Sequence, residues 1–246
     1  MSVRIAAVGD LHFGRTSPGT LQKLFAEIAV AADVLLLPGD LTDYGLPEEA
    51  RALAREIGQA AKIPMVSVLG NHDFESGHAV EVAEILREAG VVVLDGDDYE
   101  IHGVGIAGVK GFCGGFGRHA LGSWGEPVIK GFVQESLSEV LKLETALSRL
   151  RTPTKIALLH YAPVQDTVVG EPEPIFPFLG SSRLEEPINR LNATMVFHGH
   201  AHRGQLEGRT TSGIPVYNVS YPLLHRVTPE RPYRVIEVPG VVGTNP

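Results

Sequence analysis

Nine short apolar runs recur along the chain, and they constrain its fold more than any other feature of the sequence. Most are continuous and rich in β-branched residues, which is typical of strands buried on both faces. Helix-like patterns near residues 21–32, 47–61 and 77–89 separate the early runs, and this βαβαβ succession predicts a mainly parallel sheet. The later runs lie closer together and favour a second, mixed sheet packed on the first. The runs are VRIAAVGD at 3–10, DVLLLPGD at 33–40, MVSVLGNH at 65–72, VVVLDGD at 91–97, IHGVGIAGV at 101–109, KIALLHY at 155–161, ATMVFHGH at 193–200, PVYNVSY at 215–221 and YRVIEVPG at 233–240.

The chain has 246 residues, of which 43% are hydrophobic and 20% charged, so it can bury a sizeable core. Because it shows no internal repeat and no linker, we expect one domain spanning residues 1–246. Two segments rich in Gly or Pro, 110–131 and 163–182, are expected to be ordered, lid-like loops. A helical pattern at 133–151 predicts a long amphipathic helix, with a core-facing stripe formed by Leu137, Val140, Leu141, Leu147 and Leu150.

Charge and cysteine content limit the partners and the compartment. The formal net charge of −8 without a basic run makes nucleic acid an unlikely partner, although bound cations can reverse the sign at a site. The single cysteine, Cys113, allows no intrachain disulfide and fits a reducing compartment. Gly9 and Asp10 interrupt the first apolar run, which is therefore too short for a signal peptide or a membrane-spanning segment. We therefore expect a cytoplasmic protein that does not contact a membrane.

Five of the apolar runs end in side chains that can bind metal ions. In an open α/β sheet, ligands bind at the carboxyl ends of the strands, so residues distant in sequence are expected to meet at one rim. Carboxylates and imidazoles together with an amide oxygen suit Mn, Fe, Zn, Ni or Co, and a bridging carboxylate would allow two ions. Taken singly, Asp10 could be a turn residue, Asn71 a helix cap and His160 a core histidine. The side chains at the five ends are Asp10 and His12; Asp40 and Asp43; Asn71, His72 and Asp73; His160; and His198, His200 and His202.

These ends form a series of motifs that resembles the calcineurin-like metallophosphoesterases. The series is Asp-x-His at 10–12, Gly-Asp-x-x-Asp at 39–43, Gly-Asn-His-Asp at 70–73, His160 and Gly-His-x-His at 199–202. The resemblance implies an α/β fold, a four-layer α/β/β/α sandwich of two mixed β-sheets flanked by helices. It also implies hydrolysis of small-molecule phosphoesters at two divalent or mixed-valence transition metal ions.

The resemblance assigns roles to individual residues. It implies that Asp10, His12 and His202 bind one metal, that Asn71, His160 and His200 bind the other, and that Asp40 bridges the two. His72 would act on the substrate phosphate or the leaving oxygen, with Asp73 orienting its ring. The nucleophile would be a metal-bound hydroxide.

One position differs from a branch of this family, and the substrate class stays open. Purple acid phosphatases have a tyrosine at the position of Asp43, whereas Tyr44 comes one residue too late here. The Gly-Asp-x-x-Asp form resembles class III phosphodiesterases, which favours diester substrates. A phosphomonoesterase or protein phosphatase is the alternative, with Arg118, Lys110, Lys130 and Arg183 as possible phosphate contacts; a nuclease is disfavoured by the acidic charge. A non-catalytic metal-binding scaffold is another alternative, although such members tend to lack ligands that are present here.

The remaining polar residues have weaker signals. Asp43 is expected to support the turn or a ligand, and His198 is expected not to bind metal. Gly199 is expected to let the backbone turn sharply between strand and site. Arg118 and His119 are candidates for contacting the substrate phosphate. The sequence leaves open the metal identity, the natural substrate, the oligomeric state and the loop that closes over the metals.

Overall fold

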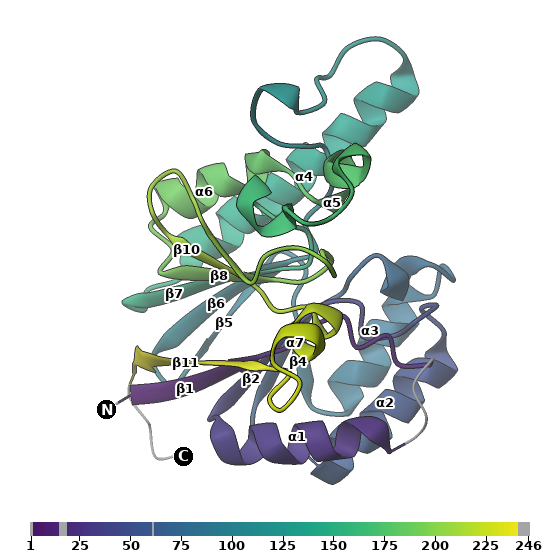
Figure 1. Cartoon of the computed structure of the whole chain (residues 1–246), viewed down its shortest axis with the longest axis vertical. Coiled ribbons are helices and arrows are strands. Elements are labelled where there is room, and N and C mark those ends of the chain that lie inside the picture. The colour runs from purple at the N-terminus through teal and green to yellow at the C-terminus, as the bar shows by residue number, and fades with distance from the viewer. Residues whose placement is uncertain (1, 15–18, 61, 241–246) are drawn as a thin grey trace.

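Two β-sheets lie face to face at the centre of the fold, and helices cover both outer faces (Figure 1). The computed structural model describes residues 2–14, 19–60 and 62–240. Its strands are β1 (Ser2–Ala7), β2 (Val34–Pro38), β3 (Met65–Val68), β4 (Val91–Val93), β5 (Asp97–Ile101), β6 (Val104–Val109), β7 (Thr154–Leu159), β8 (Met195–His198), β9 (Glu207–Arg209), β10 (Pro215–Asn218) and β11 (Arg234–Pro239). One sheet has the order β11-β1-β2-β3-β4, and the other has the order β5-β6-β7-β8-β10-β9.

Both sheets are mixed, as the family resemblance implied. In the first, β1 to β4 run parallel and β11 pairs antiparallel with β1. In the second, β6, β7, β8 and β10 run parallel, and the edge strands β5 and β9 are antiparallel to their neighbours. Parallel strands of one sheet end at the same edge, so the polar residues that follow them are brought together.

Helices cover the outer face of each sheet. The helices are α1 (Thr20–Ala31), α2 (Pro47–Ala60), α3 (Ala79–Glu88), α4 (Pro127–Arg149), α5 (Phe176–Leu179), α6 (Glu185–Arg190) and α7 (Tyr221–Val227). Helices α1 to α3 lie outside the first sheet, and α4 and α6 lie outside the second (Figure 1). The four-layer α/β/β/α sandwich is therefore confirmed. The expected end of α2 at Ala61 lies outside the described residues.

The second sheet is buried on both faces. Along β7, Ile156 and Leu158 join the core between the sheets, whereas Ala157 and Leu159 join the core under α4. This alternation follows from the two-residue period of a strand. It explains why the runs in the sequence are continuously apolar rather than alternating.

Helix α4 corrects two expectations. It begins at Pro127 rather than Val133, and proline at the first helical position is favoured because its missing N–H would be unpaired there anyway. Its buried stripe includes Val140 and Leu147 as expected, and Leu150 just after it is buried too, but Leu137 is 37% exposed and Leu141 59% exposed. Leu143 takes their place on the core side.

Two strands were not predicted from the sequence. Strand β5, with the sequence DDYEI, and strand β9, with the sequence EGR, are both edge strands. Edge strands carry charged side chains that discourage further pairing, so they lack an apolar signal. The residues 101–109, expected as one run, instead comprise the last residue of β5, the turn and the whole of β6 in the β5–β6 hairpin.

Segments 110–131 and 163–182 contact each other. Gly115 forms an isolated parallel bridge with Ser181, and the amide of Gly114 donates to the carbonyl of Pro177 over 2.8 Å. Both segments contain short helical turns, including Gly117–His119 in the first and Gln165–Val168 in the second. They are therefore more regular than the sequence suggested. No helix in the described part of the chain is long and apolar enough to cross a membrane.

Candidate metal centre

The expected metal-binding residues lie where the two sheets meet, just beyond their strands. The first sheet supplies Asp10, His12, Asp40, Asn71 and His72, and the second supplies His160, His200 and His202. Four of them have a left-handed backbone, with φ of 54° at Asp10, 43° at His12, 48° at Asp40 and 68° at His200. This conformation is strained for residues other than glycine and is typical of functional sites.

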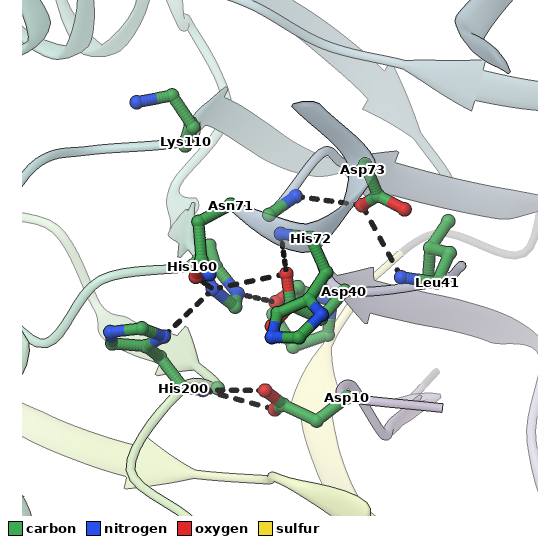
Figure 2. Close-up of polar contacts among 12 residues, drawn as sticks. Asp10, Asp40, Leu41, Asn71, His72, Asp73, Lys110, His160 and His200 are labelled. Carbon is green, nitrogen blue, oxygen red and sulfur yellow. Dashed lines mark hydrogen bonds and ion pairs between the residues drawn. The ribbon is translucent and has the colours of Figure 1, made fainter. Parts of the chain in front are cut away.

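One group of ligand atoms surrounds His160. Its Nδ1 lies 3.0 Å from the carbonyl oxygen of Pro38, which can only accept, so Nδ1 carries the proton. Its Nε2 lies 2.9 Å from Asn71 Oδ1, 3.1 Å from His200 Nδ1 and 3.4 Å from Asp40 Oδ1. Figure 2 shows these side chains directed toward one another.

The proton on His200 is fixed in the same way. Its Nε2 lies 3.1 Å from the carbonyl oxygen of Phe178, so Nε2 donates and Nδ1 presents a lone pair to His160. Four electron-pair donors therefore converge on one point. They are two imidazole nitrogens, one amide oxygen and one carboxylate oxygen. Because these groups repel one another without a cation between them, the donor set fits a divalent metal ion.

A second group contains Asp10, His12 and His202, whose ligand atoms lie within 4.8 Å of one another. His202 Nε2 is 3.0 Å from Asp10 Oδ1, and His12 lies edge-on to the His202 ring. His12 Nδ1 lies 3.3 Å from Asp43 Oδ1, which leaves its Nε2 facing the site. This arrangement also fits a metal ion, with Asp43 holding the ring of a ligand.

Asp40 lies between the two groups. Its Oδ1 is 3.4 Å from His160 Nε2, and its Oδ2 is 3.7 Å from His12 Nε2. One oxygen therefore faces each group, and a carboxylate in this position can bridge two ions. The amide of His72 donates to Asp40 Oδ1 over 2.8 Å and fixes the carboxylate from the side (Figure 2).

Three glycines of the motifs make room for these side chains. A β-carbon on Gly39 would lie 2.6 Å from His160 Nδ1, and one on Gly70 would overlap Asp40 Oδ1. A β-carbon on Gly199 would overlap Asp10 Oδ2. The backbone turns tightly at 199–201, where the amide of Ala201 donates to the carbonyl of Gly199 over 2.8 Å, and the left-handed residue of this turn is His200.

His72 lies beside the second group, and its partner differs from the expectation. Its Nδ1 is 2.6 Å from the backbone oxygen of Asp43, and its ring lies edge-on to His12 at 4.5 Å between centroids. Asp73 does not orient it. The buried Asp73 carboxylate instead accepts from the amides of Leu41, Thr42 and Gly70 and from the hydroxyl of Thr42, at 2.6–3.3 Å. Asp73 thus ties the turn after β2 to the turn after β3 (Figure 2).

A third group of possible ligands, His12, Asp43 and His72, shares His12 with the second group. Among the described residues, His198, Arg118 and His119 lie outside all three groups. His198 is fully buried, with its Nε2 2.8 Å from the hydroxyl of Thr167 in segment 163–182. Arg118 and His119 are exposed, and Arg118 Nε donates to His119 Nε2 over 3.1 Å. The structure does not bring Arg118 and His119 into contact with the described metal-binding residues.

Burial controls the charges in the site. Burial lowers the pKa of His200 to about 4 and lowers the pKa of His160 well below its usual range. Both rings are therefore neutral at pH 7, which is the state that binds metals. Burial, followed by the charges of Asp10 and Asp73, raises the pKa of Asp40 well above its usual range. A bound cation would relieve this repulsion between carboxylates.

Asp10 and His202 stabilise each other's charged forms. Burial alone would raise the pKa of Asp10, but the hydrogen bond and charge of His202 outweigh it and lower that pKa below its usual value. Burial alone would lower the pKa of His202, but its hydrogen bond to Asp10 raises that pKa instead. A metal ion bound there must displace the proton of His202.

Two positions that the sequence analysis missed act through the backbone. The carbonyl oxygens of Pro38 and Phe178 fix the protons of His160 and His200. Any residue type carries a carbonyl, so no sequence signal could have identified Phe178. Pro38 lies in a recognised motif, but its contact joins residues 122 positions apart.

Comparisons with known proteins agree with this fold. The family model described as calcineurin-like phosphoesterase matches residues 3–204. The crystal structure of TT1561 of Thermus thermophilus has 18% identity and a TM-score of 0.56, with 91% of each chain covered. The structure of a Staphylococcus aureus protein described as a putative 5′-nucleotidase, in complex with alpha-ketoglutarate, has 15% identity and a TM-score of 0.54. The match covers 89% of this chain and 48% of the Staphylococcus aureus protein. No curated protein sequence matches significantly.

Proposed function

Because this chain belongs to the calcineurin-like phosphoesterase family, we propose that it hydrolyses small-molecule phosphoesters, preferring phosphodiesters, at a dinuclear metal centre. Family membership supports a metal-dependent phosphoesterase activity. The observation that carries the dinuclear proposal is the position of Asp40, whose two carboxylate oxygens face two separate groups of ligand atoms. The ions would come from Mn, Fe, Zn, Ni and Co, since the donor set mixes nitrogen and oxygen without sulfur.

The proposed ligands follow the two groups. Asp10, His12 and His202 would hold one ion, and Asn71, His160 and His200 would hold the other, with Asp40 between them. When bound, the ions would supply positive charge to stabilise the phosphoryl group and a water acidic enough to attack at neutral pH.

His72 would serve the leaving group. Its Nδ1–H is held by the backbone oxygen of Asp43, so its Nε2 is the atom available to substrate. In the imidazolium form, which carries a second proton on Nε2, His72 would donate that proton to the departing oxygen and be left as the neutral ring protonated at Nδ1. Asp43 would act through two histidines: its carboxylate would hold the ring of His12, and its backbone carbonyl would hold the ring of His72. Asp73 would keep the turns that carry Asp40 and Asn71 in register.

The preference for diesters is supported by the positions of the cations. A phosphomonoester carries more negative charge and would favour nearby Lys or Arg groups. The Lys110 ammonium donates to the carbonyl of Gly111, and the Arg183 guanidinium donates to that of Leu121. Arg118 is exposed beside His119. A phosphomonoesterase is the second candidate, because a structural neighbour is described as a 5′-nucleotidase.

We also propose that the chain forms one domain in which segments 110–131 and 163–182 act together as a lid. Their mutual contacts and the hydrogen bond from His200 to the carbonyl of Phe178 support this role. A cytoplasmic location is proposed from the single cysteine, Cys113, in the sequence.

Matched substrates test the function. Protein reconstituted with Mn²⁺ is expected to hydrolyse bis-p-nitrophenyl phosphate with a higher kcat/KM than p-nitrophenyl phosphate, and Asp40→Ala is expected to lose both ions and turnover. The reverse ratio would establish a monoesterase. Two tightly bound ions without turnover on mono-, di- or cyclic phosphoesters would instead favour a scaffold. Wild-type turnover by metal-free Asp40→Ala would contradict the mechanism.

A further inference from the structure

A cavity of about 180 Å³ lies between α3 and the ends of β3, β4 and β6. Most of its walls are apolar, including Leu69, Ala83 and Leu94, which are at most 8% exposed. An engineered cavity of about 150 Å³ holds benzene, so this volume suits one aromatic ring. Its charged lining residues are Arg87, Asp95 and Lys110, and a few polar groups in a mostly apolar lining are typical of pockets that orient a small molecule.

The cavity adjoins the turns that carry metal-binding residues, although none of its lining residues is itself a proposed ligand. Leu69 directly precedes the Gly70–Asn71 turn, and Phe74 ends the turn that starts with His72. The backbone oxygen of Lys110, another wall residue, accepts from the amide of His160 over 3.0 Å. Three wall residues are therefore joined directly to the turns that carry Asn71, His72 and His160.

Beside these turns, the cavity extends along α3. Ala79, Ala83 and Arg87 line it on one face of that helix, which corresponds to a length of about 12 Å at 1.5 Å per residue. Phe74 is 45% exposed and Val80 is 74% exposed at its rim. Large apolar side chains left exposed around a cavity mark a surface that a ligand covers.

Lys110 gives the cavity wall a cation. Its ammonium lies 4.8 Å from the ring centre of Phe112 and 5.5 Å from those of Phe74 and Tyr161. Figure 2 shows the ammonium directed away from Asp10 and Asp40, so it belongs to the cavity rather than to the ligand groups. A cation held on ring faces suits an electron-rich aromatic group.

We propose that this cavity binds the organic group of the substrate, so that the protein selects phosphoesters of aromatic alcohols. The proposal rests on the phosphoesterase function proposed above and adds its substrate class. A phosphate held at the metals places its ester substituent at the Leu69–Phe74 end of the cavity. A methyl ester would leave the apolar walls uncovered, whereas a phenyl ester would fill them.

Binding of two phosphonates tests the proposal without requiring turnover. Isothermal titration calorimetry on Mn²⁺-reconstituted protein is expected to show phenylphosphonate binding about tenfold more tightly than methylphosphonate. Ala83→Leu, which fills the cavity, and Val80→Glu, which places a carboxylate at its rim, are each expected to reduce this ratio to about twofold or less. Val30→Glu on α1, where Val30 is 80% exposed, is the matched control and should keep the wild-type ratio.

The outcomes separate the two proposals. A wild-type ratio near one, or an unchanged ratio in Val80→Glu and in folded Ala83→Leu, overturns the aromatic subsite. Hydrolysis of phosphodiesters without phenyl selectivity shows that the subsite alone is wrong. Phenyl selectivity in a protein that hydrolyses no phosphoester shows that the proposed function is wrong while the subsite stands.

Discussion

Gly199 lies so close to Asp10 that a β-carbon at position 199 would overlap the Asp10 carboxylate and approach the Pro38 carbonyl oxygen to 3.0 Å. The next amide, that of His200, donates to both Asp10 oxygens at 2.9 and 3.0 Å. The turn after β8 therefore wraps around a carboxylate from the opposite sheet. The glycine is required by this close approach rather than by its backbone angles.

Gly199→Ala is expected to reduce metal affinity about tenfold or more, because the added methyl group displaces Asp10. Overpacking should also cost about 1–3 kcal/mol of unfolding free energy. Gly58→Ala in α2 is the matched control: a β-carbon there meets no atom within 4 Å. That substitution should stabilise the protein by about 0.5–1 kcal/mol. Metal titration and urea unfolding measure both effects, and unchanged affinity in Gly199→Ala would contradict the proposed role of Asp10.

The three histidines at 198, 200 and 202 are expected to differ on substitution by alanine. His200→Ala and His202→Ala should each lower the metal content from two ions to one, measured by mass spectrometry of the metals. His198→Ala should keep both ions and lose about 1–3 kcal/mol of stability, because it leaves the buried hydroxyl of Thr167 without its imidazole partner. If His198→Ala lost as much metal as His200→Ala, the prediction that His200 binds metal and His198 does not would be contradicted.

His72→Ala is expected to keep both metal ions while kcat falls by about 100- to 10,000-fold, the usual range for loss of a general acid. The reason is that His72 reaches Asp40 through its backbone amide, which alanine retains. Metal content and steady-state kinetics on bis-p-nitrophenyl phosphate measure the two properties. A variant that loses metal in proportion to activity would show that His72 is a ligand.

Asp73→Asn is expected to destabilise the fold more than it impairs catalysis. Asparagine offers only one acceptor oxygen, so at least one of the donors from Leu41, Thr42 and Gly70 loses its partner. Each buried donor left unpaired costs about 1–3 kcal/mol. Thermal unfolding of the metal-free variant measures this cost. Unchanged stability with a shifted pH profile of kcat would return Asp73 to the role of orienting His72.

The reactivity of the Cys113 thiol measures whether the first residues of segment 110–131 become exposed when the segment moves. The side chain is 6% exposed, and burial raises its pKa to about 11. Native protein is therefore expected to react slowly with a thiol reagent at pH 8 and rapidly once unfolded. Because the folded pKa lies above the usual value of 9.0, the contribution of Cys113 to stability is present below about pH 9 and is lost as pH rises toward about 11. Rapid native reaction would place the hinge before Cys113.

Much of the fold could be predicted because the apolar runs have a physical period. The parallel strands of both sheets are buried on both faces, and their sequences show it. The edge strands β5 and β9 could not be found, since charged residues there serve to prevent pairing. The start of α4 at Pro127 was missed because residues 127–132 include Pro127 and Gly131 and no buried side chain; the buried residues of the helix begin at Val133.

The sequence by itself determined which side chains stand after which strands, because each motif follows a strand directly and parallel strands end at one edge. Only the tertiary structure decided which side chains meet across the two sheets. Across the sheets, His160 contacts Pro38 and His200 contacts Asp10, which are 122 and 190 positions apart. These two pairings depend on how the sheets stack and on backbone groups that every residue carries, so no local pattern in the sequence could encode them.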